Sequence, residues 1–382
     1  SRVLLSNKVN YWTGQQGREF EKEFASFSDS EYAITLANGT LALDLALVAL
    51  GVGARNDGRE NDEVIVTSRT FLASVSSIVT AGATPVFADV DANTQNITAQ
   101  SIQAVMTAQT KAIICVHLAG MPCEMDEIMS LANEHDLLVI EDCAQAHGTK
   151  YKGRSVGSIG HIGAWSFCQD KIMTTGGEGG MVTTNDEALW KKMWAYKDHG
   201  KSWDAIYNKE HPPGFRWLHE SFGTNWRMTE MQSAIGRIQL KRMPLWFDQR
   251  NSNAKAIETT LASFKCIRLV EVPSHIEHAQ YKYYAFVKPE LLADGWTRDR
   301  IVNEINALDV PCFQGSCSEV YLEKAFDGTD YRPEQRLPVA KELGETSLMF
   351  LVHPTLTDEN IKLTCDAIVN VLTQANKPNA GK

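Results

Sequence analysis

The feature that most constrains the fold is a regular alternation of short apolar runs with helix-like stretches between residues 33 and 185. The runs are β-branched and nearly continuous, as strands covered on both faces are. They occupy residues 64–71, 85–90, 111–118, 137–144, 163–168 and 180–184. Helix-like stretches lie between them at 41–50, 72–81, 99–108 and 124–135. This alternation predicts an α/β domain with a mostly parallel sheet between helices.

The remaining third of the chain follows a looser pattern. Residues 225–250 suggest one long helix that closes the first domain. A strand-like run at 281–287 follows, with helix-like stretches at 297–307 and 357–374. We therefore expect an N-terminal segment and large domain over 1–250 and a smaller α+β domain over 251–382.

Composition excludes several classes of protein. Among 382 residues, 37 Lys and Arg stand against 47 Asp and Glu, so the formal net charge of −10 opposes binding to nucleic acid by general electrostatics. No apolar run approaches the ~20 residues of a membrane span, and the start lacks the pattern of a secretory signal. Eight cysteines without a C-x-x-C pair favour a reducing cytoplasm.

Five histidines invite a metal interpretation, but their spacing matches no common metal motif, and we expect no metal site; they are His117, His147, His161, His199 and His353.

Ligands of open α/β sheets collect beyond the carboxyl ends of the strands, so the polar residues that end each run are the candidates for chemistry. Glu141 and Asp142 end the apolar run LLVIEDCA, where an acid is not core filling. Such an acid can bind a metal, hold a proton-bearing ring nitrogen, or cap a helix. Gln145 follows three residues later, close enough to face the same ligand.

Two places are suited to a phosphate group. Asn38, Gly39 and Thr40 stand directly before the helical run LALDLALVAL, and a helix start offers free N–H groups and a positive dipole. An ordinary helix cap is the alternative. Ser166, at the end of the run 163–168, can donate its hydroxyl to the same group.

Lys171 follows that run and precedes the glycine-dense TTGGEGG. A lysine held near a sheet edge is what Schiff-base chemistry requires. Phe71, placed at the end of the run 64–71, can either face a planar ring or fill the core. A phosphate site, a buried acid, a hydroxyl and a lysine together are the groups that pyridoxal 5′-phosphate needs.

The sequence resembles the DegT/DnrJ/EryC1/StrS family of sugar aminotransferases, which have the type I aspartate-aminotransferase fold. The combination of EDCAQAHG with SFCQDK and GEGG is highly specific, and the motifs run in the family's order over most of residues 10–250. The matching stretches are ANGTLALDLAL (37–47), FADVDANTQNI (87–97), VHLAGMPCEMDEI (116–128), LLVIEDCAQAHG (137–148), WSFCQDKIMTTGGEGGMVTT (165–184), DHG (198–200) and NWRMTEMQSAIGRIQL (225–240).

The resemblance implies a role for each matched residue. Lys171 would bind the cofactor covalently and shuttle the proton, Asp142 would pair with the pyridine nitrogen, and Gln145 would lie near the ring hydroxyl. The phosphate would be bound by Gly39, Thr40 and Ser166.

The resemblance also implies a homodimer with active sites shared across its interface. Asn225, in the N-x-R-M motif, would reach the phosphate of the neighbouring subunit. Arg227 would be either a substrate contact or a structural ion-pair partner, and His199 a neighbour of the active site.

The implied reaction moves an amino group from L-glutamate to a keto group of a nucleotide-linked sugar, for surface polysaccharide or related glycan assembly. Two alternatives stay open: a different ketone, such as a cyclitol or a sugar without a nucleotide, and a catalytically inactive PLP-binding regulator. A dehydrogenase is excluded because no G-x-G-x-x-G follows a first strand. Residues 310–326 depart from the family's Y-x-P-x-H pattern, with Phe313 and Gln314 where it would begin, so the sugar cannot be assigned by analogy.

Overall fold

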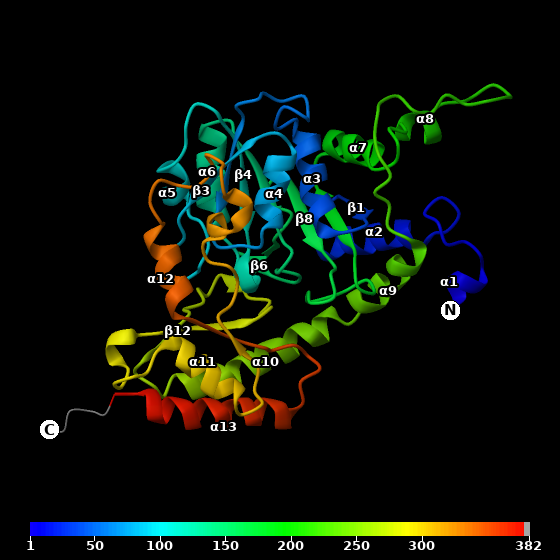
Figure 1. The fold of residues 1–382 in the computed structure, drawn as a ribbon. Helices are drawn as coiled ribbons and strands as arrows, with labels where there is room; N and C mark the ends of the chain where they lie inside the picture. The colour runs from blue at the N-terminus through cyan, green and yellow to red at the C-terminus, as the bar shows by residue number, and fades with distance from the viewer. Residues whose placement is uncertain (378–382) are drawn as a thin grey trace.

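A computed structural model describes residues 1–377, and the last five residues of the predicted second domain, 378–382, lie outside the described residues. Its centre is a seven-stranded sheet in the order β1-β9-β8-β5-β4-β2-β3 (Figure 1). The strands are β1 (Tyr32–Leu36), β2 (Glu63–Thr67), β3 (Thr84–Ala88), β4 (Thr110–Val116), β5 (Leu138–Asp142), β8 (Ile162–Ser166) and β9 (Gly180–Thr184). The five strands from β8 to β3 pair in parallel, whereas β9 runs antiparallel to both of its neighbours.

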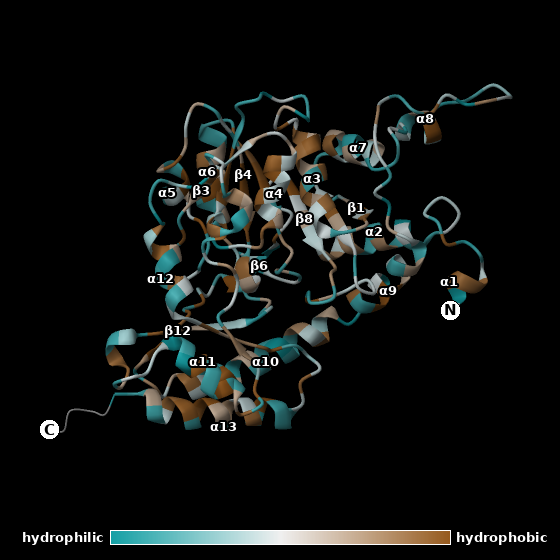
Figure 2. Cartoon of the chain, in the orientation of Figure 1, coloured by the Kyte–Doolittle hydropathy of each residue, from teal (hydrophilic) through white to brown (hydrophobic). Residues whose placement is uncertain are grey.

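Alternate residues of the central strands bury against opposite layers of helices. Val64 and Val66 of β2 pack with α3 (Gly39–Leu50), α4 (Ala73–Thr80) and α7 (Glu187–Tyr196), whereas Ile65 joins the core under α5 (Ala99–Gln103) and α6 (Met125–Glu134). Hydrophobic residues are concentrated on α3 and on β4 (Figure 2). Both faces are therefore covered, which explains why the strands read as continuous apolar runs.

Some predicted boundaries are wrong. The strand expected over 64–71 ends at Thr67, and the helix expected over 99–108 ends at Gln103. The single helix expected over 225–250 is two helices, α9 (Glu230–Leu240) and α10 (Met243–Leu261), preceded by irregular chain. Thr229 caps α9 through a capping box with Gln232, and Pro244 stands in the first turn of α10. Proline is tolerated there but would break a continuous helix, so it forces the second start.

The smaller part of the molecule is built on a four-stranded antiparallel sheet in the order β10-β12-β14-β13. Its strands are β10 (Ile267–Leu269), β12 (Tyr283–Val287), β13 (Cys312–Phe313) and β14 (Ser347–Phe350). The helices α10, α11 (Arg298–Asn306) and α13 (Asp358–Ala375) pack on this sheet, and α12 (Pro338–Thr346) lies toward the large sheet. These features confirm the predicted fold class. A boundary at residue 250 would cut α10, and the division at that point stays a prediction.

Short elements complete the chain. A three-stranded sheet joins β6 (Lys150–Tyr151) and β7 (Arg154–Ser155) to β11 (Ile276–Glu277), which ties the two parts together. The N-terminal helices are α1 (Arg2–Leu5) and α2 (Gln16–Phe27), and α8 (Trp203–Tyr207) begins a segment that extends away from the body (Figure 1). Within residues 1–377, no helix is both long enough and apolar enough to cross a membrane.

Candidate active site at the carboxyl edge of the sheet

Strands β1, β4, β5 and β8 end at one edge of the large sheet, and the polar residues predicted to act together follow those ends. Asp142 is the last residue of β5 and Ser166 the last of β8. Gly39 begins α3 three residues after β1 ends, and Lys171 lies in the loop that connects β8 to the antiparallel β9. The parallel arrangement thus places these ends at one edge.

Asp142 is a buried carboxylate with only 6% of its surface exposed. The Ser74 hydroxyl donates to its Oδ2 at 2.8 Å, and the backbone N–H of Ala144 donates to Oδ1 at 3.1 Å. Burial raises the pKa of Asp142 above its usual value, although Ser74, Ala144 and the charge of Lys171 act in the opposite direction. A positively charged ring N–H would relieve that cost.

Ser74 was missed by sequence reasoning. It lies in the first turn of α4, six residues before that helix ends, and its hydroxyl is 2.9 Å from that of Thr70. The only signal was a cluster of hydroxyl residues around Phe71, and nothing in the sequence connects that cluster with β5.

The start of α3 forms a tight cradle beside Ser166. Asn38 caps the helix by accepting a hydrogen bond from the N–H of Leu41 at 2.9 Å. A Cβ atom at Gly39 would lie 2.5 Å from Cβ of Ser166, so this position has no room for a side chain. Thr40 follows and is exposed. The helix start and the Ser166 hydroxyl thus face one small space.

Two further predicted residues border the site. Phe71 follows β2 by four residues instead of ending it, and it is 70% exposed, so the core-filling alternative is wrong. Gln145 lies in a turn and not in a helix. Its Oε1 accepts the N–H of Ala119 at 2.8 Å, which fixes the side-chain amide and leaves its NH₂ group to face a ligand.

Lys171 is held in a well-defined loop. The strand pairing continues past β8 through the N–H of Phe167 to Gly179 O at 2.8 Å and the N–H of Gln169 to Gly177 O at 2.9 Å. The side chain of Lys171 is 15% exposed, and its Nζ lies 3.6 Å from a carboxylate oxygen of Asp170. The amine is therefore neither on the open surface nor locked into a buried ion pair.

Asn225, Arg227 and His199 form a second group, around Asp198. The backbone of Asn225 bridges to that of Asp198, whose carboxylate forms an ion pair with Arg227. This contact favours the structural role for Arg227 over the substrate role. His199 is exposed and in a left-handed conformation, with its N–H bonded to Thr224 O at 2.8 Å.

The second group approaches the start of α3 through the backbone. The N–H of Ala37 donates to Trp226 O at 3.0 Å, which sets the N-x-R-M segment beside the residues that precede Gly39. No described side-chain hydrogen bond joins Asn225, Arg227 or His199 to Lys171 or Asp142. Asn225 itself is exposed, and its side chain forms no hydrogen bond within residues 1–377.

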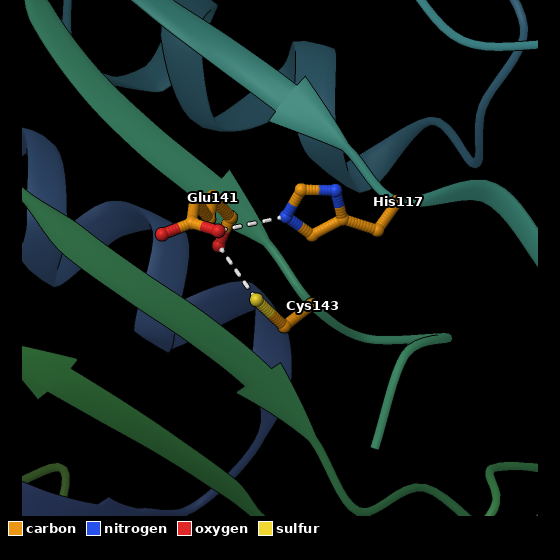
Figure 3. Close-up of side chains that lie close together, drawn as sticks. All are labelled: His117, Glu141 and Cys143. Atoms are coloured by element: carbon orange, nitrogen blue, oxygen red, sulfur yellow. Dashed lines mark hydrogen bonds and ion pairs between the residues drawn. The ribbon is translucent and has the colours of Figure 1, made fainter. Parts of the chain in front are cut away.

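Next to Asp142, the buried Glu141 belongs to a separate network. His117 and Cys143 lie beside it (Figure 3). Its carboxylate accepts from His117 Nε2 at 2.9 Å and from three backbone N–H groups, those of Gly157, Ile159 and Gly160, at 2.6–2.8 Å. The backbone N–H of Cys123 donates to Nδ1 of His117. The Glu141 carboxylate and Nδ1 of His117 are thus already occupied by hydrogen bonds that shape the end of β5.

These residues fit pyridoxal 5′-phosphate. The Gly39 cradle and the α3 N-terminus suit a phosphate, buried Asp142 suits a protonated ring nitrogen, and the exposed ring of Phe71 offers a flat surface that a bound ring would cover. A lysine stands in the adjoining loop.

Comparison with known proteins agrees with this geometry. The chain is 65% identical to an aminotransferase from Psychrobacter cryohalolentis of known structure, with a TM-score of 0.95 over 97% of this chain and 95% of that one. It is 37% identical to a GDP-perosamine synthase from Caulobacter vibrioides, over 94% of this chain and 92% of that protein. It is 35% identical to a UDP-N-acetyl-3-dehydro-alpha-D-glucosamine 3-aminotransferase from Acidithiobacillus ferrooxidans, over 94% and 89%.

A model of the DegT/DnrJ/EryC1/StrS aminotransferase family matches residues 2–369, which is nearly the whole chain. This match confirms the predicted resemblance, the predicted class of enzyme, a transaminase, and the predicted cofactor, pyridoxal 5′-phosphate. The chain is a member of the DegT/DnrJ/EryC1/StrS aminotransferase family.

Proposed function

We propose that the protein transfers an amino group from L-glutamate to a keto group of a nucleotide-linked sugar, giving an amino sugar nucleotide for surface polysaccharide or related glycan assembly. The observation that carries the proposal is the arrangement of Lys171, Asp142 and the Gly39 cradle at one sheet edge. The substrate class is supported by relatives named for GDP-linked and UDP-linked sugars, which align over more than nine-tenths of this chain.

In this proposal different residues of the chain bind the ring and the phosphate of the cofactor. Asp142 accepts a hydrogen bond from the ring nitrogen, and Ser74 keeps that carboxylate oriented. The phosphate is bound by the α3 N-terminus with Gly39, Thr40 and the Ser166 hydroxyl. Phe71 would cover one face of the bound ring, and the NH₂ group of Gln145 would serve the ring hydroxyl.

Once bound, the cofactor supplies an electron sink for the carbon next to the transferred nitrogen. Nζ of Lys171 removes the proton from Cα of glutamate and returns a proton at the carbon of the sugar that receives the amine. Backbone hydrogen bonds from Phe167 to Gly179 and from Gln169 to Gly177 hold the two ends of the Lys171 loop together, which fixes the backbone that carries the amine. Buried Asp142 favours the protonated ring nitrogen throughout, because its carboxylate has few other donors.

The proposed assembly is a homodimer with shared sites. Its support is the unused, exposed side chain of Asn225 together with three large exposed aromatic residues on the segment that extends from the body; these are Phe215, Trp217 and Phe222. Such residues are seldom left in water on a monomer. A second copy of the chain would cover them.

The test is a two-substrate assay with a panel of nucleotide-linked keto sugars and L-glutamate, in which mass spectrometry detects the exchange of a keto oxygen for an amine. The expected result is one aminated sugar nucleotide, with 2-oxoglutarate formed in equal amount. Lys171→Ala should give no product, whereas Lys22→Ala, which removes an exposed lysine on α2, should match the unchanged protein.

The same assay separates the alternatives. Product from a cyclitol or from a sugar without a nucleotide, and from no nucleotide-linked sugar, would replace the proposed acceptor. Absence of turnover in protein that binds the cofactor would favour a regulator; one relative, 33% identical, is named a pleiotropic regulatory protein from Geobacillus stearothermophilus.

A further inference from the structure

The residue directly before the candidate catalytic lysine is an acid, Asp170, and a tyrosine from the smaller part of the molecule forms a hydrogen bond with it. Asp170 lies in the loop between β8 and β9, and its Oδ2 accepts a hydrogen bond from the hydroxyl of Tyr281 at 2.7 Å. Tyr281 stands just before β12 of the small sheet and is buried. The bond therefore spans 111 residues of sequence and joins the lysine loop to the small sheet.

Lys171 lies against both members of this pair. Its Nζ is 3.6 Å from Oδ2 of Asp170 and 5.5 Å from the centre of the Tyr281 ring, on the face of that ring. A carboxylate and an aromatic face both favour an ammonium group over a neutral amine. Both groups thus lie where they would attract a positive charge on the amine.

From this geometry we infer that Asp170, oriented by Tyr281, is a positioning residue that holds the ammonium group of Lys171 whenever that lysine has taken up a proton. The inference rests on the proposed role of Lys171 and deepens it. An amine that removes a proton from Cα becomes an ammonium group, and Asp170 stabilises that product of the transfer.

The charge state of Asp170 agrees with this role. Burial raises the pKa of Asp170, but the charge of Lys171 and the bond from Tyr281 outweigh burial, and the pKa lies below its usual value. The carboxylate is therefore ionised at neutral pH. Burial and the bond to Asp170 raise the pKa of Tyr281, so its hydroxyl stays a donor.

Other charged groups also act on Lys171. Lys282 lies over the same Tyr281 ring, with its Nζ 4.9 Å from the ring centre, and Asp142 and His147 are close enough to interact with Lys171 electrostatically. Burial lowers the pKa of His147 to about 3, so its ring is neutral. Lys282 opposes the ammonium form, which leaves Asp170 as the neighbouring acid in direct contact with the amine.

The test measures the reactivity of Lys171 in protein freed of its cofactor. Acetic anhydride labels only unprotonated amines, so peptide mass spectrometry across a pH series gives the midpoint at which Lys171 becomes reactive. Because the side chain of Asp170 is 59% exposed and partly screened by water, Asp170→Asn should move this midpoint downward by about 0.5–1 pH unit. Tyr281→Phe should give a smaller shift in the same direction, because the unanchored carboxylate can turn into water.

Tyr283→Phe is the matched control. Tyr283 is a buried tyrosine two residues further along, and its hydroxyl has no hydrogen-bond partner within the described chain, so its removal should leave the midpoint unchanged. A profile for Asp170→Asn that coincides with that of the unchanged protein would overturn the inference. So would an equal shift in Tyr283→Phe, since the effect would then be a general loosening of the small sheet.

A second measurement separates this inference from the proposed function. In the loaded enzyme, Asp170→Asn should lower the rate of the glutamate half-reaction about threefold with KM unchanged, because Asp170 acts through Lys171. A rise in KM alone would replace the positioning role with a substrate contact. If borohydride reduction attaches the cofactor to a lysine other than Lys171, the proposed function fails, whereas the labelling shift still reports the Asp170 contact.

Discussion

At the residue scale, the site contains a group whose placement opposes folding. Asp142 is buried, and its pKa is raised because burial outweighs its two hydrogen bonds. A carboxyl group with a raised folded-state pKa stabilises the fold below its unfolded pKa of about 3.9, and that contribution is lost as pH rises through the folded value. At neutral pH the ionised carboxylate of Asp142 therefore does not stabilise the fold, and its role is to bind a ligand.

Asp142→Asn should separate these two effects. In cofactor-free protein at pH 7 the variant should be more stable by about 0.5–2 kcal/mol, and this gain should disappear below about pH 4. The Ser74 hydroxyl can turn to accept a hydrogen bond from the amide, because the Thr70 hydroxyl, 2.9 Å away, can then accept the Ser74 proton. Cofactor retention should fall at the same time.

Thermal unfolding at several pH values, with and without cofactor, measures both quantities. Ser77→Ala serves as a control, since Ser77 is another buried serine of α4 but its hydroxyl bonds only to the backbone of Ser74. A variant that loses stability at pH 7 and keeps full cofactor affinity would contradict this account of Asp142.

At the scale of elements, the start of α3 is packed so closely on the end of β8 that only glycine fits. A Cβ at Gly39 would meet both Cβ and Oγ of Ser166, which are short and rigid and cannot move aside. Gly39→Ala should therefore weaken retention of pyridoxal 5′-phosphate at least tenfold, with a smaller effect on pyridoxal, which lacks the phosphate.

Equilibrium dialysis with the two compounds measures that difference. Gly153→Ala is the comparison for general strain. The φ of Gly153 is +78°, so a side chain strains the β6–β7 turn, which lies apart from the site, without meeting any atom within 4 Å. Equal losses for the two compounds would show that the phosphate is not bound at this helix start.

The strands of the large and the small sheet differ in how well the sequence predicts them. The parallel strands are predictable because each is a continuous apolar run of five residues or more, buried on both faces. Of the small sheet, the sequence predicts β12, whereas β10 and β13 have only three and two residues and leave no periodic signal. The contact between Asp170 and Tyr281 was equally invisible, because it depends on how the two sheets pack.

At the scale of the whole molecule, one predicted cofactor-binding side chain, that of Asn225, makes no contact with the candidate active site of its own chain through a described hydrogen bond. Asn225 lies opposite Asp198 in a β-bridge, which the N–H groups of His199 and Trp226 close, but its side chain bonds to no described residue. The exposed aromatic residues of the segment 208–223 support the proposed homodimer in the same way, since a second copy would cover them. In the proposed homodimer, the activity of each site would depend on residues of both subunits.

Mixed subunits test this sharing. Asn225→Ala should weaken cofactor retention, and Lys171→Ala should abolish turnover. At a cofactor concentration too low to load Asn225→Ala, neither variant alone should turn over. When the two exchange subunits, half of the sites in each mixed dimer should combine an intact Lys171 with an intact Asn225, so that about a quarter of the full activity appears in a random equal mixture. Absence of rescue after verified exchange would contradict the shared-site model.

The most direct test of the central claim is the visible absorbance of the cofactor-loaded protein before and after L-glutamate is added, with Lys171→Ala measured beside it. The account predicts a visible band from the cofactor linked to the protein, which glutamate removes as 2-oxoglutarate forms, and which never develops in the variant. A band that forms normally in Lys171→Ala, or one that glutamate leaves unchanged in the native chain, would contradict the assignment of this site as a glutamate-dependent transaminase.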